Sequence, residues 1–487
     1  MIELREKRLP HRSPLTSMDH VFPVLAIVGA IYAFLTYHVN MDDFFITLRY
    51  ADNIASGKGW VFNPGEKVLG TTSPLLTILA AILIKTGVEG ILAVRILSSL
   101  FLLGTSLFCY LYFRQKQQAM AGFAAGLLIF LVLPLKQLWG NEVPLCLFFL
   151  MGSLYFFDRE KWTLSAVFQS LYALSRMEGL LFLVICSLIL FWKKRKVVYP
   201  VLTSGVVILL PWFLFSVLYF GDLFPNTLYA KARQGARPDI WIPFSRGLFQ
   251  TLSFIFMNIS YPLLSVFSLL GIVTMIRKRH VLLLSWCVIH LTVYRFLGVP
   301  GSYSWYYYLL WLLYPMFIAG GIRALIMGIK TRGSPLPKWR RLLYAALTAF
   351  ALYQGYTQPF TNTFYHNRYH LYLQVADHIE KTYSPDNKII SDEIGILGYF
   401  LEEYVILDTA GLIHGDIPSN SYFLYDYLVR TRNPELIVNC RYNPEKESRE
   451  EIFKPIRIDI GSGRKMRYDV EKVFPGDNLL VRILKRE

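Results

Sequence analysis

Charged residues and cysteines are both scarce in this sequence of 487 residues. Charged side chains make up 17% of it, whereas hydrophobic residues make up 54% and aromatic residues 16%. This composition is typical of a polytopic membrane protein and argues against a soluble enzyme. Of the five cysteines only Cys440 lies in the polar C-terminal part, so no disulfide framework is expected there. No Cys/His spacing typical of zinc sites and no internal repeat is visible.

The net charge of +16 does not indicate a nucleic-acid partner. The basic residues are not gathered in one soluble patch but lie in short connections between apolar runs, which is a feature of membrane topology. Arg5 and Arg12 precede the first apolar run, and no small-residue cleavage pattern precedes Asp42. We therefore expect a retained signal anchor with residues 1–20 in the cytoplasm.

Apolar runs of membrane-crossing length recur through most of the chain. They cover residues 21–38, 89–113, 119–134, 143–157, 162–176, 178–192, 197–220, 246–276, 280–297, 306–328 and 341–357. The sequence thus predicts a polytopic α-helical membrane domain over 21–357, with about 11 transmembrane helices. The shorter run 74–86 is expected to lie in the interface, because a crossing there would invert every later basic loop.

The positive-inside rule then orients these helices. The connections rich in lysine and arginine fall in the cytoplasm, at 114–116, 159–161, 193–196, 277–279 and 330–341. The chain from residue 358 onward is then outside. We therefore predict a multi-pass protein of the bacterial cytoplasmic (inner) membrane whose C-terminal domain faces the periplasm.

The polar tail, 358–487, predicts a small soluble α/β domain. A helix is expected at 375–380, and strands are expected at 388–391, 404–408, 436–439 and 479–483. Asp392 and Asp408 stand at the C-terminal ends of two predicted strands, where α/β sheets tend to place site residues. Capping of the following helices explains the two acids equally well. We expect this domain to cover the membrane site or to position an acceptor.

The loop 39–73, on the external side, carries the most informative stretch. Asp42 and Asp43 follow the first apolar run directly, and the apolar positions from 44 to 55 have helical spacing. This pattern predicts an amphipathic interfacial helix with Arg49 on its polar side. Asp42 could be a helix N-cap and Asp43 a first-turn charge. Two adjacent acids at a membrane edge are costly, however, which favours a functional role.

The predicted topology brings several polar stretches to the same side of the membrane. Besides Asp42 and Asp43, these are residues 140–144, 176–179, 225–231 and 303–308. Structural charges with independent roles would scatter over both faces. Their convergence therefore predicts a single external active site.

The stretch from Asp42 to Pro74 resembles the first external loop of GT-C glycosyltransferases. The likeness is to the arabinofuranosyltransferase-like branch, of the mycobacterial arabinofuranosyltransferase B type. That branch has an Asp-Asp-x-Phe-Ile-Thr-x-Arg-Tyr-Ala helix followed by a Phe-Asn-Pro-Gly-Glu turn, which stands here at 62–66. The segments 140–144, 175–179, 223–231 and 391–412 are similar to further motifs of the branch. Three positions depart from the pattern, namely Val143, Met177 and Trp305.

The resemblance implies a glycosyltransferase that uses a polyprenyl-phosphate-linked sugar, which a pentofuranose would fit. The acceptor would be an envelope glycan or glycolipid. We assign Asp42 as the base that takes the acceptor's proton and Asp43 as its partner, although the sequence allows the two roles to be exchanged. If a divalent cation (Mg, Mn or Ca) is required, the candidate ligands are Asp42, Asp43, Glu142 and Glu178. The positions implied to bind the donor phosphate or the substrate are Arg49, Arg176, Lys231, Asn226, Tyr229, Glu142 and Glu178.

A flippase or transporter of lipid-linked sugars is the alternative function. Transporters usually show internal repeats and charges near the bilayer midplane, and this sequence shows neither. An Asp42→Asn variant that still exports lipid-linked sugar but no longer transfers it would separate the two functions.

The predicted topology is testable with reporter fusions. Alkaline phosphatase, which folds only after export, is expected to be active when fused after residue 487. The same reporter fused after residue 334, in a predicted cytoplasmic loop, should be inactive because it stays inside. An inactive C-terminal fusion together with an active one at 334 would reverse the orientation.

Overall fold

The structure is a computed structural model that describes residues 18–35, 41–131, 138–193, 198–328, 338–357, 363–415, 425–442, 448–461, 464–476 and 479–487. Most of the predicted N-terminal cytoplasmic segment, residues 1–17, lies outside these described residues. The same holds for 194–197 and 329–337, which contain much of two predicted basic loops.

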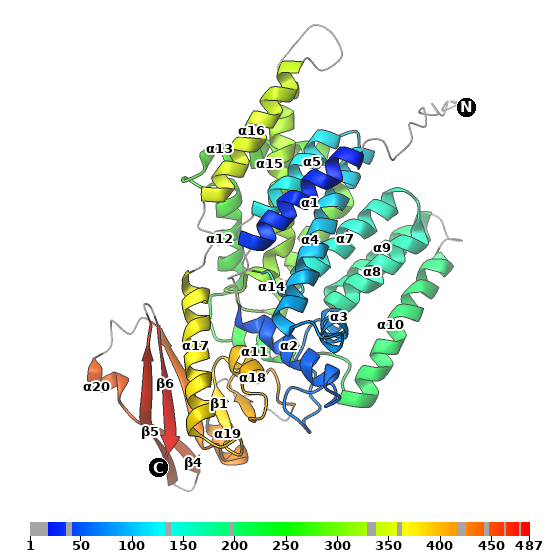
Figure 1. Cartoon of the computed structure of the whole chain (residues 1–487). Coiled ribbons are helices and arrows are strands. Elements are labelled where there is room, and N and C mark those ends of the chain that lie inside the picture. The colour runs from blue at the N-terminus through cyan, green and yellow to red at the C-terminus, as the bar shows by residue number, and fades with distance from the viewer. Residues whose placement is uncertain are drawn as a thin grey trace.

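The N-terminal three quarters of the chain form a bundle of helices (Figure 1). The α-helices are α1 (Met18–Leu35), α2 (Asp42–Ala55), α3 (Pro74–Lys85), α4 (Gly90–Gln115), α5 (Ala119–Leu128), α7 (Val143–Asp158), α8 (Trp162–Ser175), α9 (Glu178–Lys193), α10 (Val198–Phe220), α11 (Asn226–Gly235), α12 (Phe244–Phe256), α13 (Pro262–Arg277), α14 (Val281–Leu297), α15 (Tyr308–Gly328) and α16 (Lys338–Thr357). Two short 3-10 helices, η1 (Ile129–Leu131) and η3 (Ser304–Tyr307), join them.

Three of these helices are long and apolar enough to cross a membrane, within the part of the chain that the structure describes. They are Gly90–Gln115, Val201–Phe220 and Ser304–Gly328. A fourth span is formed if α13 and α14, which meet at 116°, are one broken crossing. The total of about 11 crossings stays a prediction. With 12 residues, α3 is about 18 Å long, which is shorter than the hydrocarbon core of a bilayer.

The run 246–276, predicted as one span, is two helices. Helix α12 ends at Phe256, and α13 begins at Pro262. Pro262 has no N–H to continue a helical hydrogen-bond ladder, so it begins a helix more readily than it extends one. Asn258 sits in the break, where its Oδ1 accepts from Ser260 N at 3.0 Å. Asparagine in a turn hydrogen-bonds to nearby backbone in this way.

The C-terminal part is an α/β domain with a six-stranded mixed sheet. Its strands are β1 (Ile389–Ser391), β2 (Ile406–Asp408), β3 (Leu436–Tyr442), β4 (Ile456–Gly461), β5 (Arg464–Pro475) and β6 (Leu479–Arg486), in the order β2-β1-β3-β6-β5-β4. Its helices are α17 (Thr363–Thr382), α18 (Ile394–Phe400), α19 (Tyr425–Arg432) and α20 (Arg449–Ile452). The four predicted strands and the helix at 375–380 are confirmed, whereas the β4–β5 hairpin was not foreseen.

The two faces of this sheet are covered by different helices. Strand β1 pairs in parallel with β2 on one side and β3 on the other. Ile389 packs in the main core together with α18, while Ile390 packs with Leu428 of α19 on the opposite face. The face toward α18 is therefore continuous with the core of the helical bundle.

The C-terminal domain is seated on α2 through α18 (Figure 1). Glycine is required at 395, because a Cβ there would lie 2.0 Å from the Asp42 carbonyl oxygen. A second contact is made by Asn63, which lies in the loop after α2. Its Nδ2 donates to Ile406 O at 2.8 Å and its Oδ1 accepts from Ile406 N at 3.1 Å. Asn63 thus acts as a strand partner for the outer edge of β2, which would otherwise be open.

Asn63→Ala is expected to weaken the seating of the C-terminal domain. The substitution leaves both backbone groups of buried Ile406 without their partner, at a cost of about 1–3 kcal/mol for each unsatisfied group. Thermal unfolding in detergent should show a lower midpoint than for Asn387→Ala, where an exposed amide only closes a local turn. Equal midpoints for the two variants would contradict the role of Asn63.

Candidate active site

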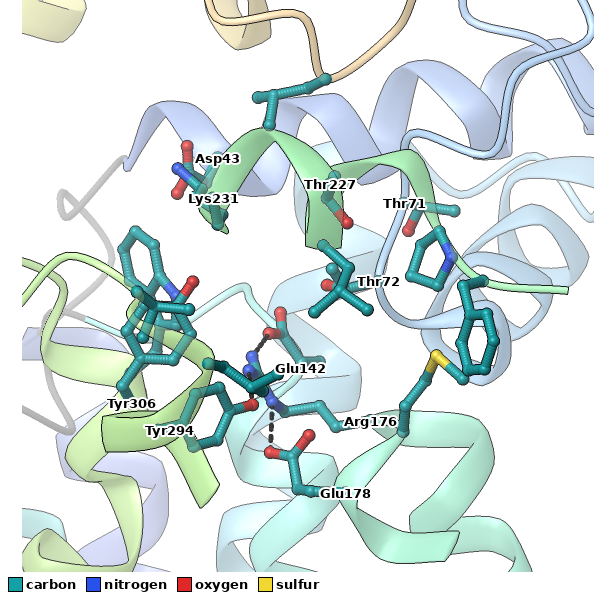
Figure 2. Close-up of a pocket in the computed structure, with 18 of the residues that line it drawn as sticks. Asp43, Thr71, Thr72, Glu142, Arg176, Glu178, Thr227, Lys231, Tyr294 and Tyr306 are labelled. Atoms are coloured by element: carbon teal, nitrogen blue, oxygen red, sulfur yellow. Dashed lines mark hydrogen bonds and ion pairs between the residues drawn. The ribbon is translucent and has the colours of Figure 1, made fainter. Parts of the chain in front are cut away.

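A cavity of about 490 Å³ opens where the ends of several helices meet. Helices α2, α9, α11 and α14 contribute to its walls, together with η3 and the loop at 70–72. Figure 2 shows its polar side chains pointing into one space, although they come from segments far apart in the sequence. Five of the predicted site residues line it, namely Asp43, Glu142, Arg176, Glu178 and Lys231.

A buried ionic triad forms the floor of this cavity (Figure 2). Arg176 Nη1 pairs with Glu142 Oε1 at 2.5 Å, and its Nε pairs with Glu178 Oε1 at 2.7 Å. Arg176 Nη2 donates to Tyr294 OH at 2.7 Å. Glu142 lies just before α7, Arg176 just after α8, and Glu178 begins α9. The ends of three helices thus bring the three charges together.

The triad leaves Arg176 with little capacity to bind a phosphate. All three of its nitrogens are engaged, and its side chain is only 6% exposed. With two carboxylates on one guanidinium the group carries a net charge of −1. A buried charge is tolerated only when it is paired and hydrogen-bonded. We therefore revise the expectation that Arg176 faces the donor phosphate and assign it to holding Glu142 and Glu178 in place.

Asp43 and Lys231 lie at the opposite side of the cavity, on α2 and α11 (Figure 2). Within the described part of the chain, neither side chain forms an ion pair or a side-chain hydrogen bond. The Lys231 ammonium rests over the Tyr303 ring, 3.9 Å from its centroid, a favourable cation–π distance. Both residues also line a second, larger cavity of about 960 Å³ beneath the C-terminal domain. They therefore stand where the two cavities meet.

Asp42 has a different environment from its neighbour. Its side chain is 2% exposed, and its two oxygens accept from Gly395 N at 3.0 Å and Ile396 N at 2.8 Å. Burial raises the pKa of this carboxyl above its usual range, against the opposing effect of nearby Arg368. The Asp42 carboxylate therefore caps α18, and we no longer assign it as the base.

Three further predicted residues lie away from the first cavity. Arg49 is 1% exposed, and its side chain donates to Phe62 O at 3.1 Å and to Glu402 O at 2.5 Å. Burial lowers the pKa of Arg49 to about 10. Asn226 Nδ2 donates to the carbonyls of the 411–414 loop, at 2.7 Å for that of His414. Tyr229 is 45% exposed and lines neither cavity. Arg49 and Asn226 hold backbone segments in place instead of contacting a substrate.

The described residues offer few ligands for a cation held by the protein alone. They contain no group of three or more His, Cys, Asp or Glu side chains that could hold a metal ion. Asp42, one of the proposed ligands, has both oxygens occupied by backbone N–H groups. Asp42 therefore does not fit as a ligand for Mg, Mn or Ca, and no step below depends on a cation.

The cavity also contains polar residues that the sequence analysis did not assign. Thr47, Thr72 and Thr227 present hydroxyl groups, and Thr227 Oγ1 is buried without a hydrogen-bond partner among the described residues. Tyr294 completes the bonds of Arg176. Thr72 and Thr227 lie inside motifs that resemble the GT-C branch, so the motifs could have indicated them. Tyr294 lies inside an apolar run, where no sequence pattern marks it.

The chain shares its fold, a helical bundle joined to an α/β domain, with a solved GT-C glycosyltransferase. No protein-family model and no curated protein matches the chain. Among solved structures, ArnT from Cupriavidus metallidurans in the apo state matches with a TM-score of 0.61 at 12% identity, covering 96% of this chain and 98% of that one. Bound to undecaprenyl phosphate, ArnT matches with a TM-score of 0.57 at the same identity and coverage.

A longer protein is also similar. Arabinofuranosyltransferase AftD from Mycobacteria has a TM-score of 0.49 at 11% identity, over 95% of this chain and 40% of that one. The similarity to ArnT confirms the fold that the GT-C resemblance implied. The arabinofuranosyltransferase-like branch stays a prediction.

The two adjacent acids should differ in their effect on stability. Asp42→Asn is expected to lower the thermal unfolding midpoint in detergent, because an amide has one oxygen to offer two backbone donors, and a buried donor left unpaired costs about 1–3 kcal/mol. Asp43→Asn should leave the midpoint unchanged, because the Asp43 carboxylate has no partner to lose among the described residues. Equal midpoints for the two variants would contradict this division of roles.

Proposed function

We propose that this protein is a glycosyltransferase that moves a sugar from a polyprenyl-phosphate donor to an acceptor hydroxyl. One observation carries the proposal: among the described residues, Asp43 and Lys231 have no ion-pair partner and line both cavities, one between the helices and one beneath the C-terminal domain. A transferase must bring two substrates to one pair of reacting groups. The fold shared with ArnT favours this reaction by analogy.

The helix-lined cavity supports a lipid-linked donor. It shares Leu180 and Val184 with an apolar groove of about 510 Å³ between α9 and α10. That groove is lined by Leu, Val and Phe side chains, whereas the cavity itself ends in charged groups. An isoprenoid tail in the groove would bring its phosphate to the polar end. The structure of ArnT bound to undecaprenyl phosphate shows that a protein of this fold binds such a lipid.

The proposed chemistry uses Lys231 and Asp43 in complementary roles. The acceptor oxygen attacks the anomeric carbon of the donor sugar, and the bond from that carbon to the phosphate oxygen breaks. The bonding electrons stay on the phosphate, which leaves as polyprenyl phosphate. Asp43 takes the proton of the attacking hydroxyl as general base. Lys231 stabilises the negative charge that develops on the departing phosphate.

The ionic triad is proposed to hold the donor sugar. Glu142 and Glu178 each use one oxygen for Arg176, which leaves their remaining lone pairs as acceptors for sugar hydroxyls. The hydroxyl of Thr227 offers a further hydrogen-bond partner. Because Arg176 fixes both carboxylates, they need little reorganisation on binding. We propose a pentofuranose as the sugar on the basis of the motif resemblance alone.

Asp43→Asn is expected to lower the release of polyprenyl phosphate roughly 10²–10⁴-fold, the usual contribution of a general base. Purified protein in detergent would be offered a panel of polyprenyl-phosphate pentoses and hexoses with envelope glycans as acceptors. Asp52→Asn is the matched control, since Asp52 lies on the same helix but lines neither cavity.

Each outcome of this assay is informative. A loss confined to Asp43→Asn supports the transferase and its base. Equal release by wild type and Asp43→Asn would reject Asp43 as the base. No release from any donor, together with transbilayer movement of the lipid-linked sugar in vesicles, would favour the flippase.

A further inference from the structure

The second cavity shares Asp43, Lys231 and Trp305 with the helix-lined cavity proposed to hold the donor. It has a volume of about 960 Å³ and runs from these two residues to the sheet of the C-terminal domain. Pockets of about 300–1,000 Å³ bury a drug-sized ligand, so there is room for more than one sugar ring. The ligand that we infer for this cavity rests on the transferase function proposed above.

The cavity lies at the part of the sheet where the strand order reverses. From β1 the chain goes to β2 on one side and then returns to β3 on the other, with α18 and α19 on opposite faces. In α/β sheets of this kind, ligands bind in the crevice outside the carboxyl ends of the strands where the order reverses. Asp392 directly follows β1 and Asn439 lies in β3, and both line the cavity.

A hydrogen-bond network orders the polar groups at this crevice. Asp392 accepts from Tyr425 OH at 2.5 Å, from Thr409 Oγ1 at 3.1 Å and from Asn439 Nδ2 at 3.0 Å. Asn439 Oδ1 in turn accepts from Arg482 Nη2 at 2.7 Å. Side chains held by one another in this way form a rigid wall with donors and acceptors in fixed positions. Such a wall suits a ligand with many hydroxyl groups.

Aromatic rings form another part of the cavity wall. Tyr303 stacks on Trp305 with centroids 4.4 Å apart, and Trp241 lies 5.7 Å from Tyr303. All three line the cavity and are half-buried. Such rings combine an apolar face with a polar edge. They can therefore pack against the apolar face of a sugar ring while its hydroxyls reach the polar wall.

The charges around the cavity are balanced. Six acidic and six basic side chains line it among the described residues. A polyanion such as a nucleic acid or a highly phosphorylated lipid calls for an excess of basic groups. The balance therefore favours an uncharged ligand that forms hydrogen bonds with both kinds of group.

We infer that this cavity is the acceptor site, and that it binds a neutral, hydroxyl-rich oligosaccharide between the carboxyl edge of β1 and β3 and the rings of Trp241, Tyr303 and Trp305. The acceptor's reacting hydroxyl then reaches Asp43 from the side opposite the donor. The rings pack against the sugar chain, and the hydrogen-bond network around Asp392 holds the polar wall of the site in place.

Direct binding tests this site without a donor. The full chain in detergent would be titrated by calorimetry with neutral arabinan, mannan and galactan tetrasaccharides, and with an anionic tetragalacturonate. One or more neutral probes should bind. Trp241→Ala should weaken that binding roughly tenfold, because it removes an aromatic face from the ligand. Arg457→Ala, on the exposed β4 side of the cavity, should weaken it as well.

Trp192→Ala is the matched control, because Trp192 is exposed on α9 and lines neither cavity. Thermal unfolding checks that each variant is folded. Donor use in the release assay is measured in parallel, so the two proposals can fail separately.

Release of polyprenyl phosphate by a protein that binds no neutral probe overturns the acceptor site but not the transferase. Binding that depends on Trp241 without any release supports the site and rejects the transferase. Preference for the anionic probe, or equal losses in Trp192→Ala and Trp241→Ala, also overturns the inference.

Discussion

The contact between the Asp42 carboxylate and the first N–H groups of α18 is the constraint on which the rest of the site depends. It fixes the C-terminal domain against α2, and Asn63 and Asn226 extend the same attachment to β2 and to the 411–414 loop. Successive residues of a helix point about 100° apart. Asp42 is turned to α18 and lines only the second cavity, whereas the next side chain, Asp43, lines both cavities. The contact between Asp42 and α18 thereby holds the two domains together and orients Asp43, the proposed base.

Charge pairing explains why Lys231, and not Arg176, is the available cation of the helix-lined cavity. Burial of Arg176 requires neutralising partners, and Glu142 and Glu178 supply them at the ends of neighbouring helices. A phosphate could displace them only by leaving two carboxylates unpaired. Lys231 instead leans on the face of Tyr303, a weaker contact that leaves its ammonium available. The cavity thus has a fixed ionic triad of net negative charge on one side and the available ammonium of Lys231 on the other.

The fold class and the meeting of distant segments could be predicted because they depend on composition and motif. Apolar runs predicted a helical membrane domain, and alternating apolar strands predicted an α/β tail with β1, β2, β3 and β6 near their observed places. Motifs pointed to Asp43, Glu142, Arg176, Glu178 and Lys231, which the structure brings to one cavity. The β4–β5 hairpin was missed because charged residues occupy much of it. The break between α12 and α13 was missed because the apolar runs on both sides of it outweighed the turn signals of Asn258 and Pro262.

The roles within each motif were decided by tertiary structure. The sequence does not show which of two adjacent acids is paired with another segment. Only the contact with α18, more than 300 residues later in the chain, distinguishes Asp42 from Asp43. Arg49 and Arg176 looked like phosphate ligands because sequence displays charge but not the partners that neutralise it. The sequence by itself therefore determined the membrane fold and the set of polar residues, through local hydrophobicity and motif. Burial and pairing, which depend on contacts between distant segments, decided which of those residues remain free to react.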